Sequence, residues 1–354
     1  MTRALNIKDA INEALDQEMS ADERVVLFGE DIAGGAGRDD DYPDAADAWG
    51  GPFGVTKGLF GKFGRERVID TAIAETGFIG ASIGAAFAGL RPVAEIMYID
   101  FIGTSFDQLL NQAAKMRYLY GGKCSIPMVV RTVAGAGFRA GAEHSQTLYS
   151  LYTHVPGLKV VAPSTAYDAK GLLIEAIRDP DPVIFIEHKR LYMVESAVPE
   201  ESYTIPFGVA KVVREGSDVT IVGIQKMVHT ALDAADGLAQ EGISAEVIDP
   251  RTLSPLDLDT IIGSVRKTGH LVVVDESNPR CSLATDIAGL VASEAFDALR
   301  GPIGLVMAPH MPVPFSPPLE DAYVPSPEQV AAAVRRARAG AVAVSAGANG
   351  LTLR

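Results

Sequence analysis

The run Ile69-Asp70-Thr71-Ala72-Ile73-Ala74-Glu75-Thr76-Gly77-Phe78-Ile79-Gly80 joins the end of an apolar strand to the start of a Gly/Ala-rich helix. Such strand–helix units build parallel sheets that are covered by helices. Glu75 falls in the first helical turn, where acids are favoured, so a helix cap is one interpretation. The other is a carboxylate close to the core and withdrawn from water, where its pKa rises and it can share a proton with a basic heterocycle.

Strands and helices alternate along the rest of the chain in the same way. Up to residue 190, strands are expected at 24–28, 67–73, 92–98, 127–133, 158–162 and 183–187, and helices at 6–19, 77–90, 105–120 and 166–178. After residue 207, strands are expected at 219–224, 245–248, 271–275 and 303–307, and helices at 227–240, 258–265, 283–299 and 327–338.

This alternation predicts the α/β class, with two doubly wound domains. The first domain is expected at residues 1–190 and the second at 208–340. Residues 191–207, which are rich in Pro and Glu, are predicted to be a linker. The Ala/Gly-rich residues 341–354 are predicted to be a mobile tail.

Composition and charge argue against nucleic-acid binding, membrane insertion and a cysteine-bound metal. The 354 residues carry a net charge of -14, which argues against binding to nucleic acid or to an anionic membrane. The longest apolar run, 77–90, is too short to span a bilayer. The two cysteines lack metal-ligand spacing, and residues 1–10 resemble neither a signal nor a transit peptide. A cytoplasmic protein is therefore expected.

Residues 135–140, Gly-Ala-Gly-Phe-Arg-Ala, match the dinucleotide-binding pattern G-x-G-x-x-A after a predicted strand. The residues that follow do not open an apolar helix. The nearest acid at the required distance, Asp168, lies inside a predicted helix rather than at a strand end. A nicotinamide site is therefore not expected here, and the glycines are interpreted as allowing close approach of a ligand or a partner chain.

Seven ordered runs then give the chain a family resemblance: GVTKGL at 54–59, IAETGF at 73–78, GLRPVAE at 89–95, EHSQ at 143–146, PGLKVV at 156–161, DAKGLL at 168–173 and DPRTLSPLD at 249–257. Across residues 4–340 the chain resembles the β subunit of the thiamine diphosphate-dependent first component of 2-oxo acid dehydrogenase complexes, a transketolase-like family. The resemblance implies a pyrimidine-binding domain followed by a transketolase C-terminal-like domain.

Within this family, the chain is most similar to acetoin dehydrogenase β subunits. The runs that suggest this branch are GGAG at 34–37, DAWGG at 47–51 and DESNPRCS at 275–282. Two features depart from the family pattern. The acidic run Asp39–Asp44 is unusual for either branch, and Glu143 stands where family members often have a neutral amide.

Thiamine enzymes hold the diphosphate through Mg²⁺ on a Gly-Asp-Gly motif, and this sequence contains no Gly-Asp-Gly. The family resemblance accounts for the gap, because a separate α subunit supplies that half of the site. It implies an α2β2 heterotetramer, with thiamine diphosphate shared between subunits and Mg²⁺ held by the α subunit. It also implies docking to a dihydrolipoyl acyltransferase core, which the acidic charge of this chain favours if the docking domain is basic.

The resemblance also assigns roles to side chains. Glu75 is expected to bind the aminopyrimidine ring nitrogen N1′, and Phe101 to pack against that ring, with Tyr98 as a second candidate for the same wall. His144 is expected to act on the substrate side as an acid/base, by positioning substrate or protonating the dithiolane during acyl transfer to lipoamide. Structural roles, as a core aromatic for Phe101 and a loop histidine for His144, remain the alternatives.

A K⁺ site is implied by the same resemblance, formed mainly by backbone carbonyls. The expected ligands lie near Met128 and after the helix that ends at Ala176, Ile177, Asp179 and Asp181. The carbonyls at a helix C-terminus are unpaired, so a cation is favourable there. The alternative is a simple helix stop before Pro180.

These expectations converge on an oxidoreductase subunit that is active only with its α subunit. It would cleave acetoin, release acetaldehyde and transfer an acetyl unit to lipoamide. Oxidative decarboxylation of pyruvate or of branched-chain 2-oxo acids is the alternative. A self-sufficient transketolase is disfavoured by the absent motif, and a non-catalytic scaffold subunit remains a remote alternative.

Overall fold

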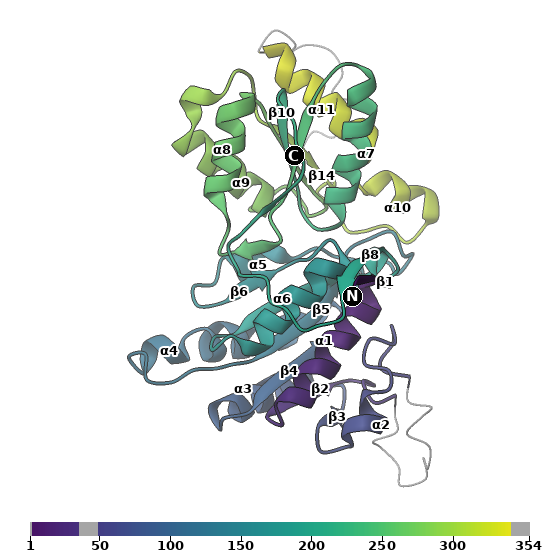
Figure 1. The fold of residues 1–354 in the computed structure, drawn as a ribbon, viewed down its shortest axis with the longest axis vertical. Coiled ribbons are helices and arrows are strands. Elements are labelled where there is room, and N and C mark those ends of the chain that lie inside the picture. The colour runs from purple at the N-terminus through teal and green to yellow at the C-terminus, as the bar shows by residue number, and fades with distance from the viewer. Residues whose placement is uncertain (1, 35–48, 341–354) are drawn as a thin grey trace.

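The computed structural model describes residues 2–34 and 49–340, and Figure 1 shows them as two lobes. The lower lobe, purple to teal, is formed by the first half of the chain, and the upper lobe, green to yellow, by the second half. The acidic run Asp39–Asp44 and the predicted tail 341–354 lie outside the described residues.

The first half is built on a sheet with strand order β12-β6-β7-β5-β4-β2-β3. Its strands are β2 (Val25–Gly29), β3 (Val68–Asp70), β4 (Arg91–Ile96), β5 (Val129–Ala134), β6 (Lys159–Val161), β7 (Val183–His188) and β12 (Thr252–Ser254). The pairs among β2 to β7 are parallel, as the alternation predicts, whereas β12 joins β6 antiparallel.

Helices cover both faces of this sheet (Figure 1). They are α1 (Ile7–Ala21), α2 (Leu59–Phe63), α3 (Glu75–Phe87), α4 (Met116–Leu119), α5 (Tyr149–Thr153) and α6 (Ala166–Arg178), with the 3-10 segments η2 (Ile99–Thr104) and η4 (Lys189–Leu191). Asn6 and Thr165 cap α1 and α6 by accepting backbone N–H groups of the first turn, which fixes where both helices begin. The apolar faces of α1 and α6 then pack into one core cluster.

The second half repeats this architecture with strand order β14-β13-β10-β11-β9. Its strands are β9 (Lys211–Arg214), β10 (Val219–Gly223), β11 (Ala245–Asp249), β13 (Leu271–Asp275) and β14 (Gly304–Met307). Its helices are α7 (Lys226–Gln240), α8 (Leu258–Thr268), α9 (Leu283–Glu294), η5 (Phe296–Ala298), α10 (Pro317–Tyr323) and α11 (Pro327–Ala339). Strand β10 lies centrally and pairs in parallel with β11 and β13.

The two halves share one buried seam. A single apolar cluster runs from the first sheet into the second half, and β12, which comes from the second half, completes the edge of the first sheet. The Arg251 guanidinium lies 3.1 Å from the Asp168 carboxylate across this seam. Tyr149 donates from its hydroxyl to Gln225 at 2.7 Å. Because both contacts are buried, they fix the two halves against each other.

The strand expected at 67–73 is the shorter β3, and the helix expected at 283–299 ends at Glu294 before η5. Two other predicted segments differ more. The helix expected at 105–120 is divided into a π-helical segment η3 (Gln108–Ala113) and the short α4, and the amide of Ala114 donates to the carbonyl of Leu109, five residues back. The wider turn places Leu109 and Ala113 in the core. The expected linker 191–207 contains strand β8 (Glu195–Pro199), which pairs antiparallel with β1 (Thr2–Asn6).

Within residues 2–34 and 49–340, no helix combines the length and the apolar character needed to cross a membrane. The helix expected at 77–90 is α3, which packs one face against β4, η2 and η3 and leaves the other exposed.

Candidate active half-site

Glu75 is the first residue of α3, and residues 71–74 connect it to the carboxyl end of β3. The side chain is half-buried, which corrects the expectation that this chain alone withdraws it from water. The reason is that α3 begins at an open edge: the neighbouring Ile73 is 80% exposed, and Ala74 and Thr76 are exposed as well. A second surface is therefore needed to desolvate this carboxylate.

An aromatic wall stands beside the start of α3. The hydroxyl of Thr76 donates to the carbonyl of Thr104 and so joins α3 to η2, which carries Phe101. The Tyr98 ring lies edge-on to Phe101 at 5.5 Å between centroids and to His144 at 4.8 Å, and Phe101 lies 5.3 Å from His144. The structure thus brings together three of the predicted site residues and links them to the helix of the fourth.

Two charged residues that sequence reasoning missed support this wall. Lys189, in η4, is buried, and its ammonium donates to the backbone carbonyl of His144 and lies 5.1 Å from the Tyr98 ring centroid. Asp100 accepts the backbone N–H and the side-chain amide of Gln146 at 3.1 and 2.9 Å. Each of these two residues follows the carboxyl end of a buried strand, where ligand sites of α/β proteins lie. That position in the sequence could have identified them as candidate site residues.

Burial changes the ionisation of this wall. Burial raises the pKa of Tyr98 above its ordinary value, and the Asp100 carboxylate adds to the shift. Burial lowers the pKa of Lys189 to about 8, although Asp100, Glu276 and Glu320 favour its charged form. A lysine with a lowered pKa next to a cluster of aromatic and histidine rings is typical of a functional site rather than of a core.

The residues of the predicted cation site lie at one corner of the first sheet, between the C-terminus of α6 and the start of β5. Arg91 donates to the carbonyls of Ile177 and Asp179 at 2.7 and 3.4 Å, and the amide of Val183 donates to the Met128 carbonyl at 3.0 Å. The carbonyls that a cation would use are therefore already partly hydrogen-bonded by groups of this chain. Of the two other predicted ligands, Ala176 is buried within α6, and the Asp181 carboxylate pairs with Arg117 and Lys159.

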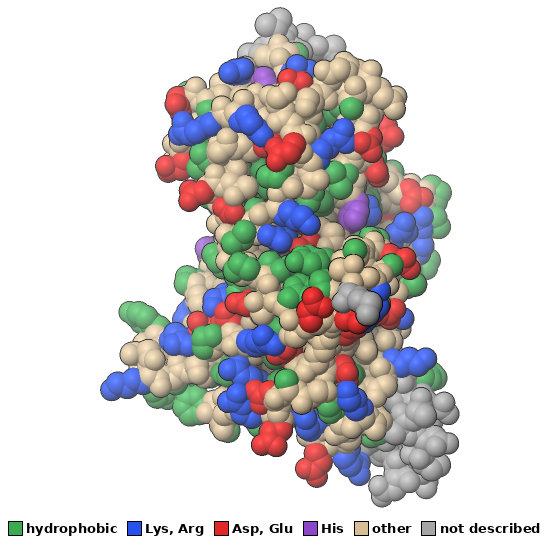
Figure 2. All heavy atoms as spheres, viewed as in Figure 1, with side chains coloured by type: hydrophobic (Ala, Val, Ile, Leu, Met, Phe, Trp, Pro, Cys, Tyr) green, Lys and Arg blue, Asp and Glu red, His purple; other side chains and the backbone are tan. Residues whose placement is uncertain are grey.

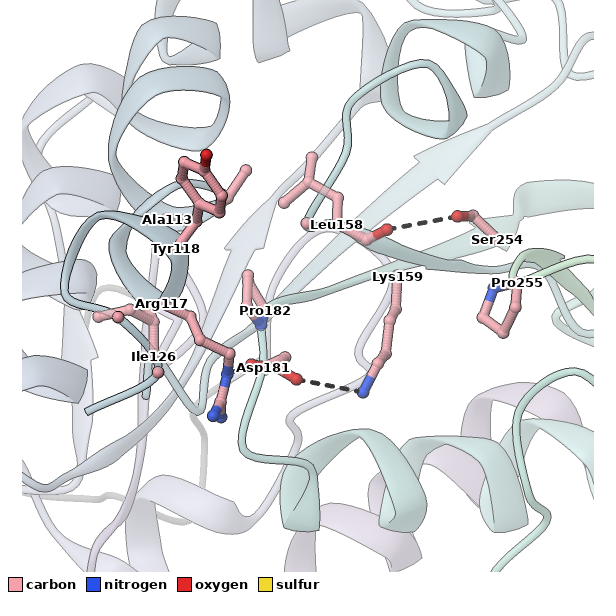
Figure 3. A pocket seen from close by; sticks show the side chains of 14 residues that line it. Ala113, Arg117, Tyr118, Ile126, Leu158, Lys159, Asp181, Pro182, Ser254 and Pro255 are labelled. Atoms are coloured by element: carbon pink, nitrogen blue, oxygen red, sulfur yellow. Dashed lines mark hydrogen bonds and ion pairs between the residues drawn. The ribbon is translucent and has the colours of Figure 1, made fainter. Parts of the chain in front are cut away.

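A cavity of about 760 Å³ opens beside this corner (Figure 3). Lys159 spans its floor, with its ammonium 2.6 Å from the Asp179 carboxylate and 3.6 Å from that of Asp181. Arg117 pairs with Asp181 from the opposite wall. The cavity is lined by neither Glu75 nor His144, so the predicted catalytic groups lie outside this hollow of the chain.

The Gly-rich loop 135–141 binds the second half of the same chain. The amide of Ala136 donates to Glu276, and the amides of Gly137 and Arg139 donate to Glu320 at 2.8 and 3.0 Å. No helix follows the loop before α5, so the dinucleotide context is absent, as expected. The interpretation that the glycines allow close approach of a ligand or a partner chain stays a prediction. Within the chain itself, the amides of Ala136, Gly137 and Arg139 donate to carboxylates of the second half.

Gly135→Ala is expected to destabilise the fold by about 2 kcal/mol or more. Gly135 has φ +97°, and a Cβ there would lie 2.0 Å from Nε2 of the buried His188. Gly141→Ala is a matched control, since φ is +79° but a Cβ would meet only Phe315 at 3.5 Å. Thermal unfolding should show a larger fall in Tm for Gly135→Ala than for Gly141→Ala. Equal falls in Tm would mean that the positive φ, and not the clash with His188, causes the destabilisation.

Several large apolar side chains remain exposed on this chain, among them Ile73, Tyr118, Leu119, Phe296 and Phe315. Figure 2 shows one face, where apolar side chains gather near the middle of the molecule while basic and acidic ones intermingle over both lobes. The excess of acids therefore does not form one continuous acidic patch on this face.

Two doubly wound halves with a half-exposed carboxylate at a helix start and an aromatic wall beside it define an α/β subunit of the transketolase type. The model described as the transketolase pyrimidine-binding domain matches residues 3–195, and that of the transketolase C-terminal domain matches 208–330. A solved structure described as a split-gene transketolase, an inactive β4 tetramer, has TM-score 0.74 at 23% identity. The match covers 95% of this chain and 98% of the split-gene transketolase chain, so the two share a fold.

Curated relatives narrow the class. The β subunit of acetoin:2,6-dichlorophenolindophenol oxidoreductase from Cupriavidus necator is 60% identical, covering 96% of this chain and 99% of the relative. The same subunit from Bacillus subtilis is 57% identical, and the match covers 93% of this chain and 96% of that relative. The pyruvate dehydrogenase E1 component subunit beta of Rickettsia felis is 46% identical, covering 94% and 98%. The chain therefore belongs to the transketolase-like family of thiamine-dependent dehydrogenase β subunits, which confirms the family resemblance.

Proposed function

We propose that this chain is the β subunit of a cytoplasmic enzyme that cleaves acetoin to acetaldehyde and an acetyl unit. The acetyl unit passes to lipoamide, whose disulfide is reduced as the thioester forms. The observation that supports acetoin is the gradation of identity, 60% and 57% to relatives named for acetoin against 46% to one named for pyruvate. Oxidative decarboxylation of pyruvate or a branched-chain 2-oxo acid is the second candidate.

The proposed assembly is an α2β2 heterotetramer docked on a dihydrolipoyl acyltransferase core. The half-exposed Glu75 and the 80% exposed Ile73 support it, because an α subunit seated there would withdraw the carboxylate from water. The absence of Gly-Asp-Gly from the sequence supports Mg²⁺ and diphosphate binding by the α subunit. A K⁺ ion at Met128, Ala176, Ile177, Asp179 and Asp181 is proposed as a structural cation.

The described residues fit the aminopyrimidine half of thiamine diphosphate. Glu75 offers a carboxylate free of ion pairs within residues 2–34 and 49–340, and Phe101 and Tyr98 offer an aromatic wall beside it. When bound, the cofactor supplies the nucleophilic carbon that attacks a ketone. This chain's part is to hold a proton between Glu75 and the ring nitrogen, and to give or take a proton at His144.

The domain division expected from the sequence stays a prediction: 1–190, linker 191–207, 208–340 and tail 341–354. Strand β8 lies inside the linker range and holds it against β1.

Activity is expected only when this chain is combined with its α subunit. The assay would offer acetoin, pyruvate and branched-chain 2-oxo acids with thiamine diphosphate, Mg²⁺ and an artificial electron acceptor. We expect acetoin to give the highest kcat/KM. Preference for a 2-oxo acid would favour the second candidate, and activity from this chain alone would overturn the shared site.

A further inference from the structure

Lys189 contacts both the backbone of the loop that carries His144 and the Tyr98 ring of the aromatic wall. It follows β7 in the short η4 turn and is only 4% exposed. Its ammonium donates to the backbone carbonyl of His144, which lies 45 residues earlier, and it lies over the face of Tyr98. A cation over an aromatic face is attracted by the ring's negative quadrupole, and burial strengthens that attraction.

The loop that carries His144 is anchored at both ends of the segment His144–Gln146. Lys189 binds the carbonyl at the first residue, and Asp100 accepts both the amide and the side chain of Gln146 at the other end. Between the anchors, the His144 ring is edge-on to Tyr98 and Phe101. The imidazole position is therefore set by its backbone and by two rings, and Lys189 contacts both the backbone and one of the rings.

We propose that Lys189 is a positioning residue, which holds His144 at the depth in the site where its imidazole can exchange a proton with the substrate or the lipoyl group. This inference rests on the proposed function, because it gives His144 its substrate-side role. Lys189 acts through the carbonyl of His144 and the Tyr98 ring, and it touches neither reactant itself.

The ionisation of Lys189 is in keeping with a functional rather than a stabilising role. Its pKa in the fold, about 8, lies below its ordinary value of 10.5, so folding disfavours the charged form. The penalty is complete below pH 8 and is relieved as the pH rises toward 10.5. The charged groups that face it are Asp100 on η2, Glu276 after β13 and Glu320 on α10, and they do not offset its burial. Uncharged replacements remove this penalty but lose the bond to the His144 carbonyl, so we expect only a small change in stability at pH 7.

The test uses the α/β holoenzyme with Lys189→Met and Lys189→Arg, and Lys226→Met as the matched control. Lys226 is also partly buried with a lowered pKa, but it bonds Thr230 rather than the site loop. For Lys189→Met we expect kcat for lipoamide acetylation to fall about 10–100-fold. The exchange rate of the thiazolium C2 proton should stay within about twofold of the wild-type rate, a change in barrier of under 1 kcal/mol. The reason is that this exchange depends on Glu75 rather than on His144.

Two further readouts do not depend on turnover. Hydrogen–deuterium exchange of residues 141–147 should become faster in Lys189→Met and stay unchanged in Lys226→Met, and the Tm of Lys189→Met at pH 7 should change little. Lys189→Arg should restore slow exchange and part of the turnover, because it retains a cation that can donate to the carbonyl.

The proposal is overturned if proton exchange and acetylation fall together in Lys189→Met, or if amide exchange of 141–147 does not change. A wild-type holoenzyme without activity on any of the substrates would instead refute the proposed function. In that case amide exchange still decides whether Lys189 fixes the loop: faster exchange supports this role, and unchanged exchange overturns it.

Discussion

Glu75→Gln is expected to lower the turnover of the α/β holoenzyme by about 10²–10⁴-fold, the usual contribution of a positioned acid/base. The amide keeps the size of the side chain and can still hydrogen-bond a ring nitrogen. It cannot share a proton with that nitrogen, so cofactor activation is lost while cofactor binding is largely retained. The half-buried position of Glu75 at the start of α3 implies little change in stability.

The measurements for this variant are kcat, the exchange rate of the thiazolium C2 proton, and Tm. Glu66→Gln is a suitable control, because Glu66 is an exposed acid before β3, and its turnover should stay within about twofold. Both kcat and proton exchange should fall in Glu75→Gln with Tm unchanged. Near-wild-type turnover would refute the assignment of Glu75.

Arg131→Ala is expected to destabilise the protein by about 3–5 kcal/mol, the typical cost of removing one partner from a buried ion pair. Arg131 is 2% exposed in the middle of β5, between two acids on neighbouring strands. Its guanidinium lies 2.5 Å from Glu95 on β4 and 2.7 Å from Glu187 on β7. The hydroxyl of Tyr192 also donates to Glu187 at 2.7 Å.

The loss of stability in Arg131→Ala should depend on pH. Burial already raises the pKa of Glu95, and Arg131 is the main influence that lowers it again. Without Arg131, the folded-state pKa of Glu95 lies further above its unfolded value, so stability is retained at low pH and lost as the pH rises. Urea unfolding at pH 5 and pH 8 should therefore show the larger loss at pH 8.

Arg335→Ala is the control for this experiment, because its ion pair with Glu241 is exposed and should contribute little to stability. Adding Glu95→Gln to Arg131→Ala removes one unpaired charge and should recover part of the lost stability. A loss below about 1 kcal/mol for Arg131→Ala at pH 8 would contradict this account of the buried cluster.

Much of the fold could be predicted because its signals are local. The period of apolar residues marks α1, α3 and α6, and the alternation of strands and helices implies parallel sheets. The break at η3 could not be predicted, because its residues keep a helical pattern and only packing against α3 favours the wider turn. Strand β12 was missed for a related reason: it is short, and its partner β6 lies about ninety residues earlier.

The candidate site divides in the same way. The chemical types of Glu75, Phe101 and His144, and the absence of Gly-Asp-Gly, are properties of the sequence itself. Their arrangement is not. Sheet order places β5 between β4 and β7, so residues beyond three separate strands meet at one edge, and Lys189 reaches His144 only there.

The sequence by itself therefore determined the α/β class, the family and the residue types of the candidate site, since these depend on residue type and local period. The tertiary structure alone decided that Glu75 lies at an open edge. It also decided that amides of the Gly-rich loop donate to Glu276 and Glu320, and that Lys189 donates to the carbonyl of His144. These features depend on contacts between residues far apart in the chain, and such contacts are fixed by packing and strand order rather than by any local pattern.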